Sequence, residues 1–226
     1  MHSAPASRVR LGLYALVVAA LLFLVGILLR GAIVDPTADP TGFAREAAAS
    51  STVSAWTLIL AGGIVCLFGL IGLYGRLAST AHERLAFAGF VLSFAGLALV
   101  LPLFGFMAMA APHIGTVYAP GQEAVMNVAT GYFTGTLSLG VLMAASLLYV
   151  AGSICTALVI WRGEQAPWWV AAAFVLQAPL LTFPVNLWLE TLGAVLLLVV
   201  GGYFARGAAP QPVSTAVEAA PASIES

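Results

Sequence analysis

Lysine is absent from this sequence, and charge of both signs is scarce. The chain has 8 arginines and 9 acidic residues among 226 positions, giving a formal net charge of −1. A chain this poor in cations offers no basic surface to the phosphates of DNA or RNA, so we exclude nucleic acid as a partner. Charged residues make up only 8% of the chain, whereas soluble domains contain about a quarter. The composition instead predicts the lipid bilayer as the surroundings of most side chains.

Cysteine and histidine are almost as rare. Cys66 and Cys155 lie inside hydrophobic runs, where a thiol behaves as a small apolar side chain. The sequence therefore predicts neither a disulfide framework nor a cysteine-based zinc site. The three histidines, His2, His82 and His113, all lie outside the hydrophobic runs. Their positions exclude haem ligation between spans and a serine protease whose histidine base lies within the membrane.

Familiar catalytic motifs are also missing. The sequence has no G-x-S-x-G elbow, no H-E-x-x-H pair and no phosphate-binding glycine motif after a strand. We therefore assign no catalytic residue, no cofactor and no metal ligand, and the balance favours a protein that is not an enzyme. An intramembrane enzyme stays open as a third hypothesis, which needs a nucleophile and a base brought together by the fold.

Long hydrophobic runs are what this sequence does contain, since 62% of its residues are hydrophobic. Six runs approach or exceed the length that crosses the roughly 30 Å hydrocarbon core at about 1.5 Å per helical residue. They cover residues 11–29, 55–75, 85–109, 132–161, 167–183 and 187–204, and the last two are near the lower limit. The pattern predicts an all-α, polytopic transmembrane bundle of six spans over residues 11–206. A polar lead at 1–10 precedes it, and a disordered cytoplasmic tail at 207–226 follows.

Arginine placement predicts the orientation of this bundle, because cytoplasmic span ends are enriched in positive charge. With six spans, one side holds only Arg30 and Arg45. The other side holds Arg8, Arg10, Arg76, Arg84, Arg162 and Arg206. Both termini are therefore expected in the cytoplasm, and tyrosines and tryptophans at the span ends agree with an interfacial aromatic belt.

Local patterns predict where some helices start and how they pack. Asp39 followed by Pro40 is typical of the cap and first position of a short interfacial helix, and the turns at Asp35 and Asp39 favour structure over calcium binding. Residues 80–83, Thr-Ala-His-Glu, have the form of a capping box that starts the third span. Glycines at three- and four-residue spacing along 55–75 predict close packing against another helix.

The stretch 168–190 is the best candidate for a site, because it admits polar and helix-breaking residues into an apolar region. Gln177 lies near the middle of span five. Pro179 frees the carbonyl of Val175, so a donor and an acceptor can meet where lipid would satisfy neither. Glu190 lies about one turn inside span six. An ionisable residue in a span is by default a functional candidate.

Three further polar residues belong to this candidate pocket. Asn186 is placed to cap the sixth span, and His113 and Asn127 belong to the long connection at 112–131. If spans three to six pack around one axis, these side chains line an outward-facing polar pocket together with Gln177 and Glu190. Its ligand, if any, is not identified by the sequence.

Each of these residues also has a plainer interpretation. Glu190 is either a proton or cation site, or a carboxylate that the helix dipole favours in a first turn. Gln177 is either part of the pocket or a donor in an ordinary hydrogen bond between helices. His113 follows Pro112 at a helix end and, without a second histidine nearby, fits an interfacial residue equally well.

The layout resembles a group of bacterial six-helix membrane proteins, the domain-of-unknown-function 4386 type. The resemblance rests on Arg-Leu-Gly-Leu-Tyr at 10–14, the polar loop at 35–46, the long second outer connection, and Trp-Arg-Gly at 161–163 followed by Pro167 and Trp168. It covers residues 8–206 in layout. It implies a multi-pass protein of a bacterial inner membrane and no particular activity, so it supplies no functional residues.

Two functions remain open at this stage. The first is a structural or regulatory membrane protein that works through helix contacts, with a helix partner or a second copy of itself. The alternative is a small carrier or ligand-binding protein that uses the polar pocket of Gln177, Asn186 and Glu190.

Overall fold

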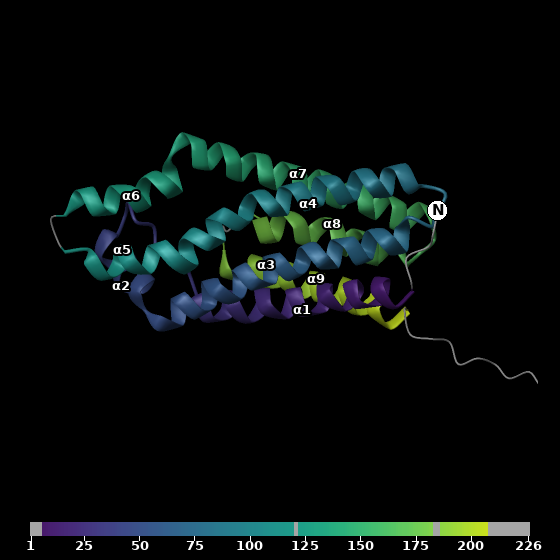
Figure 1. The fold of residues 1–226 in the computed structure, drawn as a ribbon, viewed down its shortest axis with the longest axis horizontal. Helices are drawn as coiled ribbons and strands as arrows, with labels where there is room; N and C mark the ends of the chain where they lie inside the picture. The colour runs from purple at the N-terminus through teal and green to yellow at the C-terminus, as the bar shows by residue number, and fades with distance from the viewer. Residues whose placement is uncertain (1–5, 120–121, 183–185, 208–226) are drawn as a thin grey trace, which may run out of the picture.

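The computed structural model describes residues 6–119, 122–182 and 186–207, and the elements assigned in these ranges are helices (Figure 1). The predicted tail, apart from Gly207, lies outside the described residues, as do positions 1–5 of the predicted lead. The helices are α1 (Ala6–Arg30), α2 (Pro40–Ala48), α3 (Ser50–Leu77), α4 (Glu83–Gly105), a π-helical turn η1 (Phe106–Ala110), α5 (Ala111–Val117), α6 (Glu123–Thr134), α7 (Thr136–Arg162), α8 (Trp168–Thr182) and α9 (Leu187–Gly207).

Five stretches of helix are long and apolar enough to cross a membrane, as far as the described residues extend. They are Ser7–Arg30, Ser50–Leu77, Glu83–Val117, Ala124–Arg162 and Leu187–Gly207. The sixth predicted span corresponds to α8, which has 15 residues and a length of about 22 Å. The all-helical class is confirmed and a membrane protein is indicated, but a sixth crossing rests on this short helix.

The six apolar helices form a closed ring. α1 packs along α3 and α9, α4 packs along α3 and α7, and α8 lies between α7 and α9 (Figure 1). The short helices α2, α5 and α6 gather at one end of the ring, which we call the α2 end. α1 begins and α9 finishes at the opposite end.

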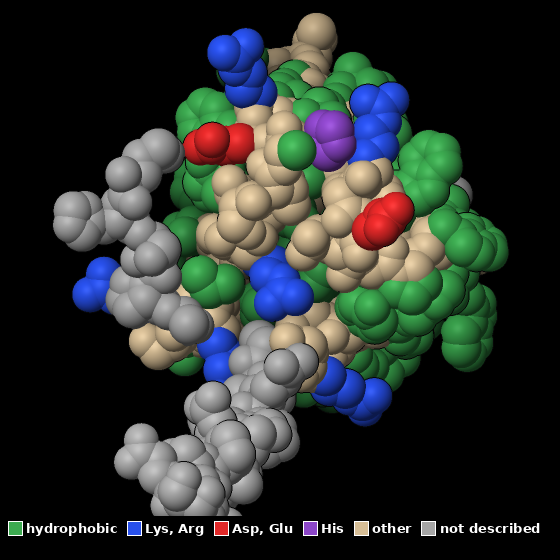
Figure 2. Space-filling view, turned by 90° about the vertical axis from the view of Figure 1, so that its right-hand side faces the viewer, with side chains coloured by type: hydrophobic (Ala, Val, Ile, Leu, Met, Phe, Trp, Pro, Cys, Tyr) green, Lys and Arg blue, Asp and Glu red, His purple; other side chains and the backbone are tan. Residues whose placement is uncertain are grey.

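That opposite end carries most of the arginines. Arg76, Arg162 and Arg206 lie in the last turns of α3, α7 and α9. Figure 2 looks onto this end and shows basic side chains at its rim and near its centre. We call it the arginine-rich end. Of the remaining arginines, Arg30 closes α1 and Arg45 lies in α2, so both belong to the α2 end.

Several helix boundaries differ from the predicted ones. α1 begins at Ala6, inside the predicted lead. The third run does not end at residue 109, because a π-helical turn at Phe106–Ala110 continues into α5, which has Pro112 in its first turn and ends at Val117. The fourth helix begins at Glu123 instead of 132 and is broken at Gly135, whose extended backbone (ψ 137°) separates α6 from α7.

The predicted helix starts have different outcomes. The Asp39 cap of α2 is confirmed, because its side chain accepts a hydrogen bond from the Gly42 N–H at 2.8 Å and Pro40 is the first helical residue. The capping box at 80–83 is wrong. Helix α4 starts at Glu83 with His82 as its cap, and the Thr80 hydroxyl instead donates to the Leu77 carbonyl at 2.8 Å.

Glycines bring two helix pairs into backbone contact. A Cβ added to Gly72 of α3 would lie 2.5 Å from Cα of Gly12 in α1, which confirms the predicted packing strip on this span. The α4 and α7 helices meet in the same way, since a Cβ on Gly96 would lie 2.6 Å from the backbone N of Tyr149. Close approach at small residues is the usual way in which membrane helices associate.

Candidate functional site

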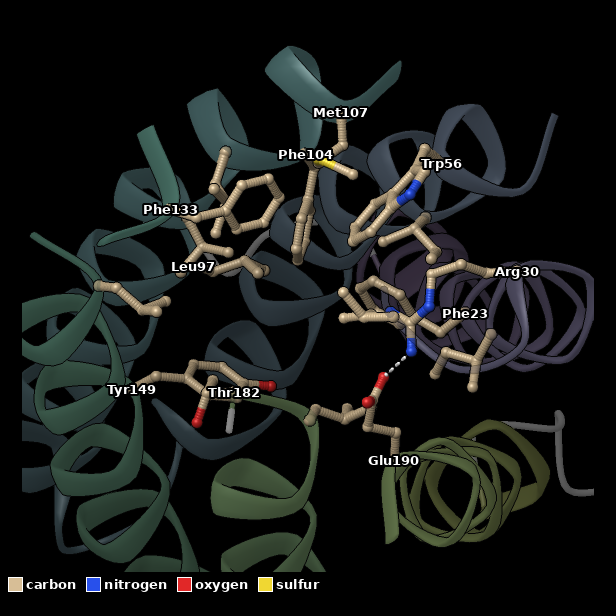
Figure 3. Close-up of a pocket in the computed structure, with 17 residues that line it drawn as sticks. Phe23, Arg30, Trp56, Leu97, Phe104, Met107, Phe133, Tyr149, Thr182 and Glu190 are labelled. Atoms are coloured by element: carbon tan, nitrogen blue, oxygen red, sulfur yellow. Dashed lines mark hydrogen bonds and ion pairs between the residues drawn. The ribbon is translucent and has the colours of Figure 1, made fainter. Parts of the chain in front are cut away.

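The candidate site lies at the tip of the hairpin formed by α8 and α9, which is shorter than the other ring helices. α8 ends at Thr182 and α9 starts at Leu187, while α1, α3, α4 and α7 continue towards the α2 end. Beside the tip of this hairpin lies a cavity of about 120 Å³, which residues of all six ring helices line. Its wall is mostly apolar and includes the aromatic side chains of Phe23, Trp56, Phe104, Phe133 and Tyr149 (Figure 3).

An ion pair forms the charged part of the wall. Nη2 of Arg30, the last residue of α1, lies 2.7 Å from Oε2 of Glu190, in the first turn of α9 (Figure 3). Both side chains are only 6% exposed. The guanidinium carbon of Arg30 also lies 5.1 Å from the centre of the Trp56 ring, which is cation–π distance. The two charges therefore neutralise each other inside the bundle.

A second polar contact lies next to the cavity wall, between α7 and α8. Gln177 of α8 is fully buried, and its amide shares a hydrogen bond of 3.3 Å with the hydroxyl of Tyr149 on α7. Its Nε2 also donates to the carbonyl of Phe174 at 3.1 Å, and not to the Val175 carbonyl that the sequence predicts as its partner. Tyr149 lines the cavity and Gln177 does not, so Gln177 orients a wall residue from the next layer.

The other predicted pocket residues lie elsewhere. Asn186 is exposed and caps α9, where its Oδ1 accepts a hydrogen bond from the Trp188 N–H at 2.8 Å. His113 is exposed on α5 and Asn127 is exposed on α6. None of the three is among the residues that line the cavity. The fold thus brings Glu190 to the cavity, and Gln177 through Tyr149, but leaves His113, Asn127 and Asn186 at the surface.

Sequence reasoning missed Arg30 as a site residue, because it was counted only as a charge that sets orientation. A signal was present. Arg30 closes the first hydrophobic run and Glu190 opens the sixth, so any six-span layout puts these opposite charges at the same end of the bundle. The described residues include no group of three histidines, cysteines or carboxylates that could hold a metal ion.

Comparisons with models of protein families, with curated proteins and with solved structures find no match to this chain. The resemblance to the domain-of-unknown-function 4386 type therefore stays a prediction.

Proposed function

We propose that this protein is a multi-pass membrane protein, not an enzyme, that binds a small, mostly apolar molecule in the cavity between its six ring helices. The observation that carries the proposal is the cavity of about 120 Å³ with the buried Arg30–Glu190 pair in its wall. Well-packed interiors contain few empty spaces larger than a water molecule, so a cavity of this size favours a role in binding a ligand.

The size and lining of the cavity indicate the class of ligand. An engineered apolar cavity of about 150 Å³ in another protein binds benzene, so this cavity has room for a single small ring or a short alkyl group. The aromatic side chains of Trp56, Phe104 and Phe133 offer such a ligand favourable face and edge contacts. The ion pair adds one polar end to an otherwise apolar site.

The ion pair itself favours binding over stability as its role. Replacing a buried ion pair by well-packed apolar residues is often neutral or stabilising, because two charges must lose their water. A bundle that needed only stability would gain little from Arg30 and Glu190 at this place. Ionisable residues that face a cavity within a membrane bundle are instead typical of sites that handle a ligand or an ion.

A structural or regulatory role is the second candidate, and the glycine contacts favour it. Gly12 against Gly72, and Gly96 against Tyr149, hold helix pairs at backbone distance. The same device would let this protein associate with another membrane helix or with a second copy of itself. This role requires no ligand, so a binding experiment separates the two candidates.

The test fills the cavity and measures binding of a small neutral aromatic molecule. Leu97 is buried in the cavity wall, so Leu97→Trp should occupy the space and weaken the binding of ethylbenzene by at least about tenfold in calorimetric titration of the purified protein in detergent. Leu147, which is 62% exposed on α7, is the matched control, and Leu147→Trp should leave the affinity unchanged. Equal affinities in both variants, or no binding by the unaltered protein, would contradict the proposal.

We further propose that α8 completes a sixth crossing and that the arginine-rich end faces the cytoplasm of a bacterial cell, in its inner membrane. The support is that α3, α7 and α9 each carry an arginine in the last turn at that end, together with the positive-inside rule. A fluorescent protein fused to the C-terminus should then fluoresce, and an alkaline phosphatase fused there should be inactive. With the N-terminus fixed in the cytoplasm, the reverse result would mean that α8 does not cross.

A further inference from the structure

We propose that the cavity selects a small organic cation, and that the Arg30 side chain occupies the cation's place until the ligand arrives. This inference rests on the binding function proposed above and names its ligand class. On binding, the cationic group of the ligand takes over the contacts with Glu190 and Trp56, and Arg30 turns to Glu46 of α2.

The cavity wall already contains a cation site, and the Arg30 side chain fills it. The guanidinium of Arg30 lies 2.7 Å from Glu190 and 5.1 Å from the centre of the Trp56 ring. A carboxylate beside an aromatic face is the combination that recognises ammonium groups in proteins. Phe23 and Phe104 line the adjoining space, where they would receive the apolar body of a ligand (Figure 3).

The Arg30 side chain has a second carboxylate within the same region, Glu46. A smaller cavity of about 20 Å³ lies beside the first, and Arg30 and Trp56 line both. Glu46 lines only the smaller one, is half-buried, and makes no side-chain ion pair or hydrogen bond within the part of the chain that the structure describes. A volume of this size holds about one water molecule, so the packing around Arg30 and Glu46 has a gap that must widen to admit the guanidinium.

The backbone beside Arg30 permits such a movement. α1 ends at Arg30, and Gly31 follows with a φ of +71°, a conformation that glycine adopts without strain. No atom lies within 4 Å of the position that a Gly31 Cβ would occupy. On this side the Arg30 side chain is held by one hydrogen bond, which its Nε donates to the Gly31 carbonyl at 3.2 Å and which must break when the guanidinium turns.

The balance of buried charges selects a cation over an anion. With a bound cation, the ligand neutralises Glu190 while Arg30 pairs with Glu46, so no buried charge is left alone. A bound anion would take Arg30 and leave the carboxylate of Glu190, whose side chain is 6% exposed, without a partner. An uncompensated buried charge is costly, so the site disfavours an anionic ligand.

Three probes of similar shape test the charge preference. Benzylammonium carries one positive charge, ethylbenzene is its neutral isostere, and benzoate carries one negative charge. Calorimetric titration of the full chain in detergent should show benzylammonium binding at least about tenfold more tightly than ethylbenzene, and benzoate binding more weakly than both.

Two variants test the residues. Glu190→Gln should abolish the preference for benzylammonium, and an unchanged affinity for ethylbenzene would show that this variant is folded. Glu46→Gln removes the second partner of Arg30, so it should weaken benzylammonium binding about tenfold and leave ethylbenzene binding unchanged. Glu83→Gln, an exposed carboxylate at the arginine-rich end, is the matched control and should change neither affinity.

The outcomes separate the two proposals. Ethylbenzene binding that Leu97→Trp weakens, together with benzylammonium binding no tighter than ethylbenzene, would leave the binding function standing and overturn the cation selectivity. Tighter binding of benzoate would assign recognition to Arg30 and overturn it too. A protein that binds none of the three probes would overturn both proposals.

Discussion

The α4–α7 pair is packed in two different ways along its length. Towards the arginine-rich end, Gly89 and Gly96 of α4 and Gly152 of α7 let the two backbones touch. Towards the α2 end, Val100 and Leu103 of α4 face the cavity across from Leu142 of α7. The same two helices thus form a tight seam in one half and enclose a void in the other.

The difference follows from the size of the side chains at the contact. Glycine removes the side chain that would keep helices about 8–10 Å apart, so dispersion contacts between backbones hold the seam. Large aromatic and branched side chains keep the helices apart in the other half, where charge is buried. The seam is therefore expected to contribute net stability, whereas the buried ion pair of the open half contributes little net stability and becomes costly only when one partner is removed.

The largest expected effect lies in the open half. Arg30→Met leaves the carboxylate of Glu190 buried and unpaired, so it should lower the free energy of unfolding by about 3–5 kcal/mol. The double variant Arg30→Met with Glu190→Met should recover most of this loss, because no buried charge remains. Chemical unfolding in mixed micelles measures both. A double variant as unstable as the single one would show that packing of the side chains, and not charge, is what matters here.

The seam should respond to a single methyl group. Gly96→Ala places a Cβ 2.6 Å from the Ala145 carbonyl oxygen and the Tyr149 nitrogen, so α4 and α7 must separate. We expect this to lower the free energy of unfolding by about 1–3 kcal/mol. Gly140 of α7 is the matched control from the open half, because no atom lies within 4 Å of its Cβ position. Gly140→Ala should be neutral or slightly stabilising. The comparison of the two halves would fail if both substitutions had the same effect on unfolding.

Tyr149 belongs to both halves, since it lines the cavity and packs against Gly96. Tyr149→Phe keeps the ring and removes the hydroxyl that bonds to Gln177 at 3.3 Å. We expect a loss of about 0.6 kcal/mol, the average for such bonds between membrane helices. In the Tyr149→Phe background, Gln177→Leu should lower the free energy of unfolding by about 0.6 kcal/mol less than it does in the unaltered protein, because the bond is already absent. Independent losses in this double-mutant cycle would show that the hydrogen bond carries no energy.

The smallest effect is expected outside both halves, at Asp35. Hydrogen bonds from the Thr37 hydroxyl and N–H, each at 2.7 Å, hold the pKa of this exposed carboxyl below its ordinary value of 3.8. Its contribution to stability is present above the ordinary value and disappears as the pH falls through the lowered pKa. Thr37→Val should raise the pKa towards 3.8 in an NMR titration. An unchanged titration would remove the Thr37 hydroxyl as the cause.

The helices were predictable from the sequence because hydrophobic runs of this length have no other stable state in a membrane. The cap at Asp39 followed from local chemistry, since its partner Gly42 is 3 residues away. The ion pair was out of reach of local patterns, because Arg30 and Glu190 are 160 residues apart and meet only when α1 packs against α9. Gln177 was singled out as polar, but its partner Tyr149 depended on how α7 and α8 pack.

The π-helical turn at Phe106–Ala110 has a consequence for the part of the helix that follows it. A turn of this kind holds about one residue more than an α-helical turn, and each α-helical residue advances the direction of the side chains by about 100°. Past the turn, Gly115 meets α2, where a Cβ would lie 2.9 Å from the nitrogen of Ala48. The extra residue therefore turns the side chains of α5 about the helix axis relative to those of α4. The continuous helix packs against α3 and α7 along α4 and against α2 along α5.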